Sequence, residues 1–207
     1  MTVAPRLILF AVVLLLAAGA GALLAKQQLQ PSPVELATGT RLSPPREAPQ
    51  FSLVSHTGAR FEREALRGRW TLMFFGFTHC PGICPMTLTT LADVRRRLHD
   101  LPAPELPQIV LVSVDPERDT PERMAEYVLG FDAPIVGVTG RAQAIDEFAA
   151  GFGITHRKVP TGGGNYMVDH SGVVLLFDRA GREAAVFSPP HTAAQLAADY
   201  RRMLGRG

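Results

Sequence analysis

Hydrophobic and polar residues follow three different patterns along the 207 residues of the chain. Residues 7–25 are apolar or glycine throughout and carry no charge. Residues 26–50 are more polar and contain five prolines. From residue 51 onward, short apolar runs alternate with longer segments in which apolar residues recur at helical spacing. The pattern therefore predicts a membrane anchor, an extended proline-rich linker and one folded domain, over residues 7–25, 26–50 and 51–207.

The folded region has the alternation of strands and helices that is typical of α/β domains. Nearly continuous apolar runs predict strands that are buried on both faces, at residues 51–54, 70–77, 109–114 and 135–138. Apolar residues at helical spacing predict helices, at residues 85–98, 119–129, 141–150 and 192–204. The order of these elements predicts a central, largely parallel sheet with flanking helices that ends in an antiparallel hairpin.

Two local patterns lead to more specific predictions. Residues 165–170 and 173–178 are both strand-like and are separated by Ser171-Gly172, so we expect them to pair as a hairpin. Asp119 and Glu122 stand three residues apart before an apolar helical segment, which predicts Asp119 as the N-cap of that helix. A contact of these acids with a metal or a partner is the alternative interpretation.

The N-terminal apolar segment has the length of a membrane span. Nineteen helical residues reach about 28 Å, close to the hydrocarbon thickness of a bilayer. A cleaved signal peptide is the alternative, but its apolar core is usually only ~7–15 residues long. The short tail, residues 1–6, carries Arg6, which favours a cytoplasmic N-terminus. We therefore expect a single-pass protein of the bacterial inner membrane whose domain faces the periplasm.

Charge and cysteine content exclude several classes of protein. The chain has 21 basic and 19 acidic residues, so it lacks the strong positive charge of a nucleic-acid-binding protein. Its two cysteines are too few for a disulfide framework in a domain of this size. They are also too close together for a bond between them to stabilise the fold much. Chemical reactivity or metal binding explains the pair better.

These two cysteines, Cys80 and Cys84, lie in the turn between an apolar strand and a predicted helix. Their spacing places both sulfurs on one side of the chain near the start of that helix. Free N–H groups and the helix dipole favour the thiolate form there, which predicts a lowered pKa. Thiolates bind Cu(I) and also Zn²⁺, but two thiolates leave the coordination of either metal incomplete.

His170 is the candidate third ligand. It lies where a predicted strand meets a turn, and parallel sheets gather the carboxyl ends of their strands at one edge, where ligands bind. We expect the strand after this turn to lie beside residues 74–77. A lone histidine is commonly a structural residue instead, and the pattern alone leaves that alternative open. His79, next to Cys80, is expected to be exposed.

Four segments agree in order and spacing with the Sco/SenC family of copper-binding cytochrome c oxidase assembly proteins. They are residues 74–85, 114–121, 136–140 and 166–171. The resemblance extends over roughly residues 38–204 and includes the single N-terminal anchor. It implies a thioredoxin-like fold in which Cys80, Cys84 and His170 bind one copper ion.

The resemblance also implies a copper metallochaperone rather than an enzyme. Such a protein delivers copper to the dinuclear copper site of cytochrome c oxidase subunit II, or prepares the thiols of that site. The expected cargo is Cu(I), with Cu(II) as an alternative, and a copper donor and a thiol reductant are implied as further partners. Asp119, Tyr166 and Asp169 are candidates for side chains that surround the ligands. Many relatives carry an acidic residue where this chain has Gly82, which puts partner docking and redox tuning in doubt.

A membrane-anchored thiol-disulfide oxidoreductase acting on periplasmic protein cysteines is the alternative function. Such enzymes usually have the spacing C-x-x-C, whereas this chain has C-x-x-x-C, and no proline stands at the turn that carries His170. In either case Cys80 and Cys84 are the redox-active pair, because an oxidised pair cannot bind copper as thiolates. Two cysteines, one histidine and a water would also suit Zn²⁺, so copper depends in part on the resemblance.

Overall fold

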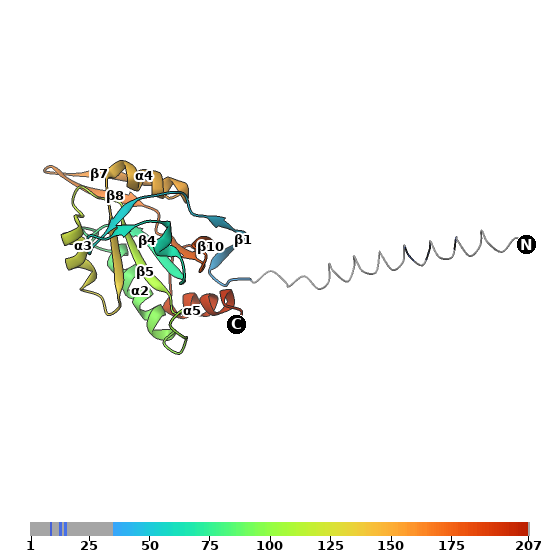
Figure 1. Cartoon of the computed structure of the whole chain (residues 1–207). Coiled ribbons are helices and arrows are strands. Elements are labelled where there is room, and N and C mark those ends of the chain that lie inside the picture. Colours follow the sequence, from blue (N-terminus) through green and yellow to red (C-terminus); the bar gives the residue numbers. More distant parts are fainter. Residues whose placement is uncertain (1–8, 10–12, 14, 16–34, 207) are drawn as a thin grey trace, which may run out of the picture. The chain divides into compact units, whose positions relative to one another are not determined.

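A mixed sheet of eight strands forms the centre of the domain (Figure 1). The computed structural model describes residues 9, 13, 15 and 35–206. The strand order is β1-β10-β9-β4-β5-β6-β2-β3, in which β4, β5 and β6 are parallel and the other neighbours antiparallel. The strands are β1 (Gly39–Glu47), β2 (Leu53–Ser55), β3 (Arg60–Phe61), β4 (Thr71–Gly76), β5 (Gln108–Ser113), β6 (Ile135–Thr139), β9 (Val174–Phe177) and β10 (Arg182–Phe187).

Helices cover both faces of this sheet. They are η1 (Arg63–Leu66), α2 (Ile83–Arg97), α3 (Pro121–Val128), α4 (Ala142–Gly151) and α5 (Ala193–Met203). The strand β4 is buried along its whole length, and its side chains alternate between the two faces. Phe75 packs against Phe148 of α4, whereas the next residue, Gly76, faces Cys84 of α2. The helices α2 and α5 pack against each other. The predicted α/β architecture, a central sheet with flanking helices, is confirmed. The expectation of a largely parallel sheet is wrong, because only two of its seven strand pairings are parallel.

A second, two-stranded sheet lies apart from the main one. It is the hairpin of β7 (His156–Gly162) and β8 (Asn165–His170). The predicted pairing of residues 165–170 with 173–178 is therefore wrong. The fully apolar β9 enters the main sheet between β4 and β10, where all four of its residues are buried. The more exposed β8 pairs instead with β7, whose polar sequence gave no strand pattern.

The strand β1 corrects the prediction for the start of the domain. Residues 39–47, inside the predicted linker, pair with β10 at the edge of the main sheet. The register shifts between Arg41 and Arg46, the stretch that contains Pro44 and Pro45. Proline cannot donate a ladder hydrogen bond, and it is tolerated at an edge strand or a bulge. Because of these prolines the sequence predicted a linker where the structure has an edge strand.

The start of α3 differs from the predicted capping box. The N-cap is Thr120, whose hydroxyl accepts a hydrogen bond from the backbone N–H of Arg123 at 3.3 Å. The prediction of Asp119 as N-cap is therefore wrong. Pro121 fixes the first helical position, and Asp119 is completely buried and turns toward the cysteine loop instead.

The predicted tail and membrane anchor lie outside the described residues, apart from Leu9, Val13 and Leu15. In the part of the chain that the structure describes, no helix combines the length and the apolar character needed to cross a membrane.

The first residues of the domain are held by one buried carboxylate, that of Asp199 in α5. It accepts hydrogen bonds from the backbone N–H groups of Ala37 and Thr38, at 2.7 and 2.8 Å, and from the Thr38 hydroxyl. Burial acts to raise the pKa of this group, but these hydrogen bonds and that from Arg202 outweigh it and hold the pKa below its usual value. Asp199 thus ties the chain that enters β1 to the C-terminal helix.

We predict that Asp199→Ala lowers the free energy of unfolding by about 2 kcal/mol, because it removes the shared acceptor of two backbone N–H groups and a hydroxyl. Denaturant unfolding measures this loss. The difference from wild type is largest above about pH 4 and shrinks in acid, because a carboxyl with a lowered pKa stabilises the fold only while it is ionised. As a control, Asp100→Asn removes an exposed ion pair with Arg201 and should have a much smaller effect. Equal effects of both substitutions would contradict the anchoring role.

Candidate metal centre

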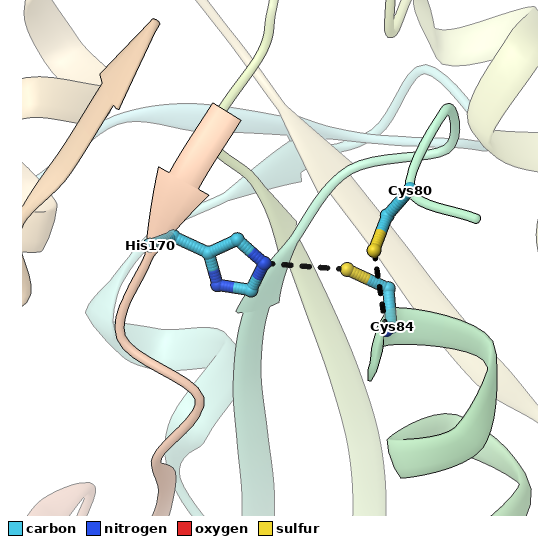
Figure 2. A group of neighbouring side chains, drawn as sticks. All are labelled: Cys80, Cys84 and His170. Carbon is cyan, nitrogen blue, oxygen red and sulfur yellow. Dashed lines mark hydrogen bonds between the residues drawn. The ribbon is translucent and has the colours of Figure 1, made fainter. Parts of the chain in front are cut away.

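Three side chains from separate parts of the sequence meet at one edge of the main sheet (Figure 2). Cys80 lies in the loop after β4, Cys84 in the first turn of α2, and His170 at the end of β8. Their sulfur and nitrogen atoms all lie within 4.8 Å of one another. Cys84 Sγ is 3.4 Å from His170 Nε2, and the backbone N–H of Cys84 donates to Cys80 Sγ at 3.4 Å. The structure thus brings together the three residues that the sequence singled out.

Residues at the end of β4 and directly after it line one side of this centre. The rings of Phe74 and Phe77 stand edge-on to the His170 ring, with centroids 5.8 and 5.9 Å away. Between them, Gly76 leaves room for the cysteine helix. A Cβ atom at this position would lie 2.8 Å from the Phe74 ring and 3.0 Å from Cys84 Sγ, closer than carbon normally approaches either atom. The missing side chain therefore lets α2 place Cys84 directly against the strand.

The buried carboxylate of Asp119 holds the loop that carries Cys80. It accepts hydrogen bonds from the Thr78 hydroxyl at 2.7 Å, from the Thr78 backbone N–H at 3.1 Å, and from the Ser113 hydroxyl at 2.7 Å. A carboxylate buried away from water needs such donors. Asp119 thus connects the end of β5 to the start of the cysteine loop. His79 is half-exposed beside this network, in line with the expectation that it does not face the sulfurs.

The hydrogen bonding of His170 determines which of its ring nitrogens is free. Nδ1 lies 3.1 Å from the carbonyl oxygen of Ser171, which can only accept, so Nδ1 carries the proton. Nε2 then presents its lone pair toward Cys84. Burial lowers the pKa of His170, which keeps the imidazole neutral. A neutral imidazole held through its other nitrogen is the form in which histidine binds metals.

The protonation of Cys84 differs from the expectation for a thiol at a helix start. Burial raises the pKa of Cys84 well above its usual value, and a backbone hydrogen bond at Phe77 offsets only part of this. The predicted lowering is therefore wrong for this cysteine. The N–H group at the start of the helix points at Cys80 Sγ instead. A metal ion that binds here must displace the proton of Cys84.

Two further residues suggested by the sequence lie away from the sulfurs. Tyr166 donates its hydroxyl to Asp115 at 2.8 Å. Asp169 is exposed and lies 3.9 Å from Arg157. Among the described residues, neither is hydrogen-bonded to Cys80, Cys84 or His170. The sequence analysis did not single out Asp115, although it lies in the same acidic segment as Asp119.

Two hollows in the protein surface lie near the centre. A polar hollow of about 430 Å³ borders His170, lined by Thr155, His156, Arg157, Asp169, His170 and Ser171. On the other side, an apolar hollow of about 350 Å³ is lined by Ile83, Met86, Thr87, Thr90, Pro189, Pro190 and His191. Ile83 and Met86 flank Cys84 in the chain and are 44% and 70% exposed. The first hollow therefore borders one of the three candidate ligands, His170, whereas the second borders only the helical turn that carries Cys84.

The family model described as SCO1/SenC matches residues 40–205. Protein SCO2 homolog, mitochondrial, from Bos taurus is 37% identical over 153 residues, which cover 73% of this chain and 58% of that protein. The alignments with three curated relatives span 58%, 60% and 64% of those proteins' own lengths.

Two solved structures show what the fold is similar to. The crystal structure of Arabidopsis thaliana ScoI with copper bound has a TM-score of 0.72 and 31% identity, covering 76% of this chain and 98% of the other. BsSco, described as a member of the Sco family of cytochrome c oxidase assembly proteins with a disulfide switch, has a TM-score of 0.60 and 25% identity. That alignment covers 76% of this chain and 93% of BsSco.

We predict that Gly76→Ala destabilises the domain and displaces Cys84 from the strand. The added methyl group overpacks the contact between β4 and α2, which typically costs about 1–3 kcal/mol. Denaturant unfolding of the reduced protein measures the loss. Wild-type stability of the variant would show that the close approach of Cys84 to β4 is not required.

We also predict that Cys84 reacts slowly with iodoacetamide in the folded protein at neutral pH. The thiolate is the nucleophile, and burial both raises the pKa of Cys84 and shields its sulfur. Mass spectrometry of the alkylated peptides follows the rate. In guanidinium chloride the same cysteine should react like an ordinary thiol, which serves as the control. Equal rates for Cys84 in folded and denatured protein would contradict the conclusion that burial suppresses its reactivity.

Proposed function

Because the chain belongs to the SCO1/SenC family, we propose that its domain is a copper metallochaperone that binds one copper ion through Cys80, Cys84 and His170. The observation that carries this proposal is the meeting of two sulfurs and one imidazole nitrogen within 4.8 Å. The relative from Arabidopsis thaliana, whose structure was solved with copper bound, supports copper as the cargo.

The donor set suits Cu(I). Two thiolates and one neutral imidazole are the soft and borderline ligands that this ion prefers. His170 is already neutral, with Nδ1 hydrogen-bonded to Ser171 and Nε2 free. The three donors are therefore positioned before the metal arrives, and only the cysteines need to release protons. Zn²⁺ would accept the same donors together with a water, so the choice of metal requires a direct test.

We further propose that the copper acceptor is the dinuclear copper site of cytochrome c oxidase subunit II. The description of BsSco as belonging to a family of cytochrome c oxidase assembly proteins supports this acceptor. The exposed side chains of Ile83 and Met86 provide a surface beside Cys84 on which an acceptor protein can dock. The apolar segment at residues 7–25 supports a single-pass anchor in a bacterial inner membrane, with the domain in the periplasm.

A thiol-disulfide oxidoreductase is the second candidate function. The contact that favours it is the hydrogen bond from the Cys84 N–H to Cys80 Sγ, which holds the two cysteines next to each other. In such a reaction both thiols are oxidised to one disulfide while a disulfide of the substrate is reduced to two thiols. Copper binding requires the reduced pair, so a thiol reductant is a necessary partner in both functions.

A Cu(I) titration of the reduced, anaerobic protein against a chromophoric chelator tests the proposal. We predict one copper per chain and a loss of affinity of roughly tenfold or more in His170→Ala, about 1.4 kcal/mol for each factor of ten. Cys80→Ser should weaken binding further, because it removes a thiolate. His99→Ala is the control, since His99 is exposed and its ring contacts the carbonyl oxygen of Arg96 in the last turn of α2. A parallel titration with Zn²⁺ establishes the preference for copper.

Binding that does not respond to loss of His170 would contradict the three-ligand site. In that case, reductase activity that requires both cysteines and tolerates His170→Ala would favour the oxidoreductase. Absence of specific copper binding in the wild-type protein would rule out the chaperone.

A further inference from the structure

The position of His170 does not follow from the main sheet. His170 ends β8, and β8 pairs only with β7 within the described residues. A short connection, residues 171–173, leads from β8 to β9 in the main sheet. The contacts that hold the β7–β8 hairpin against the rest of the domain must therefore determine where the imidazole stands relative to the cysteines.

One group of contacts lies at the base of the hairpin. His156, the cross-strand partner of His170, pairs with Asp146 of α4 at 3.1 Å. A second group lies further toward the tip. There Lys158 pairs with Glu117, and both residues are partly exposed. An exposed ion pair contributes little to holding two segments together.

The third group is a cluster of Asp115, Arg118 and Tyr166, and the buried side chain of Val168 adds apolar contacts from the same strand. The Arg118 guanidinium lies 3.9 Å from the centre of the Tyr166 ring and donates from Nη1 to the Tyr166 carbonyl oxygen at 3.2 Å. Asp115 is completely buried and uses both carboxylate oxygens. One accepts the Tyr166 hydroxyl at 2.8 Å, and the other pairs with Arg118 Nε. Arg118 thus holds the ring and the backbone of a single hairpin residue.

This cluster also contacts Phe77, one of the aromatic residues that line the metal centre. The Arg118 guanidinium lies 5.8 Å from the centre of the Phe77 ring, which in turn stands edge-on to His170. Asp115 and Arg118 belong to the same loop as Asp119, which holds Thr78 before Cys80. One loop, residues 115–119, therefore contacts both the segment that carries Cys80 and the hairpin that carries His170.

We propose that Arg118 is a positioning residue for copper binding, which acts by holding the hairpin so that His170 stays against the two cysteines. This inference rests on the proposed function. Loss of the Arg118 side chain removes the stacking and the hydrogen bond on Tyr166 and so loosens this part of the hairpin. The hydroxyl of Tyr166 keeps its hydrogen bond to Asp115. His170 then contributes less to binding, while both thiols remain in place.

A double-mutant cycle on copper affinity tests this role. Cu(I) competition is measured for the full-length reduced protein and for Arg118→Ala, His170→Ala and the double variant. We expect Arg118→Ala to weaken binding by about fivefold in the wild-type background and by less than about twofold in the His170→Ala background. Such non-additivity is the mark of a residue that acts through His170, and a general loss of stability would not produce it.

Two further variants make the test specific to the contacts of Arg118. Arg118→Lys keeps the charge but loses the planar group, so we expect an intermediate affinity. Arg96→Ala is the matched control, because Arg96 is 65% exposed and pairs with Asp93 of its own helix at 2.7 Å. Thermal unfolding of each variant confirms that it is folded at the temperature of the titration.

The outcomes separate this inference from the proposed function. Equal losses for Arg118→Ala in both backgrounds, or no loss in either, would overturn the role of Arg118 and leave the copper site standing. Copper binding that ignores His170 would instead refute the proposed function. In that event, the positioning role of Arg118 is tested in metal-free protein, by measuring nuclear Overhauser effects between the rings of Phe77 and His170. We expect them to weaken in Arg118→Ala, and unchanged effects would overturn the inference.

Discussion

Two buried carboxylates in one loop are the constraint on which the arrangement of the candidate metal centre depends. Asp115 and Asp119 are both fully buried, and a buried charge is stable only where donors surround it. The donors of Asp119 come from the end of β5 and from the loop before Cys80. Those of Asp115 come from its own loop and from the β7–β8 hairpin. The hydrogen bonds to both carboxylates therefore fix three segments relative to one another. These are the end of β5, the loop before Cys80 and the β7–β8 hairpin.

Burial has a second consequence, which concerns the chemistry of the centre. It raises the pKa of Cys84 and lowers that of His170, so both groups are uncharged in the metal-free protein. A neutral thiol next to a neutral imidazole requires no counter-charge inside the protein. Copper must then replace a proton on Cys84, so affinity rises with pH. The same burial thus couples metal binding to proton release.

The likeness to the SCO1/SenC family covers residues 40–205, and so it concerns the domain and not the N-terminal segment. Within the domain, Gly82 stands between the two cysteines, where the sequence resemblance leads one to expect an acidic residue. A Cβ atom at this position would meet no other atom within 4 Å. The glycine is therefore not required by packing, and an acidic side chain at this position would extend into open space beside the cysteines.

The sequence by itself determined the elements whose own residues are buried in a regular pattern. The strands β4, β5 and β6 and the helices α2 to α5 lie within one or two residues of the ranges that the apolar pattern predicted, and Cys80, Cys84 and His170 meet as expected. Only the tertiary structure decided the pairing of β8 with β7, the edge strand β1, the role of Asp119 and the protonation of Cys84. Periodicity reports whether a segment is buried, but the partner of a polar strand, the donors around a carboxylate and the solvation of a thiol come from residues distant in the chain.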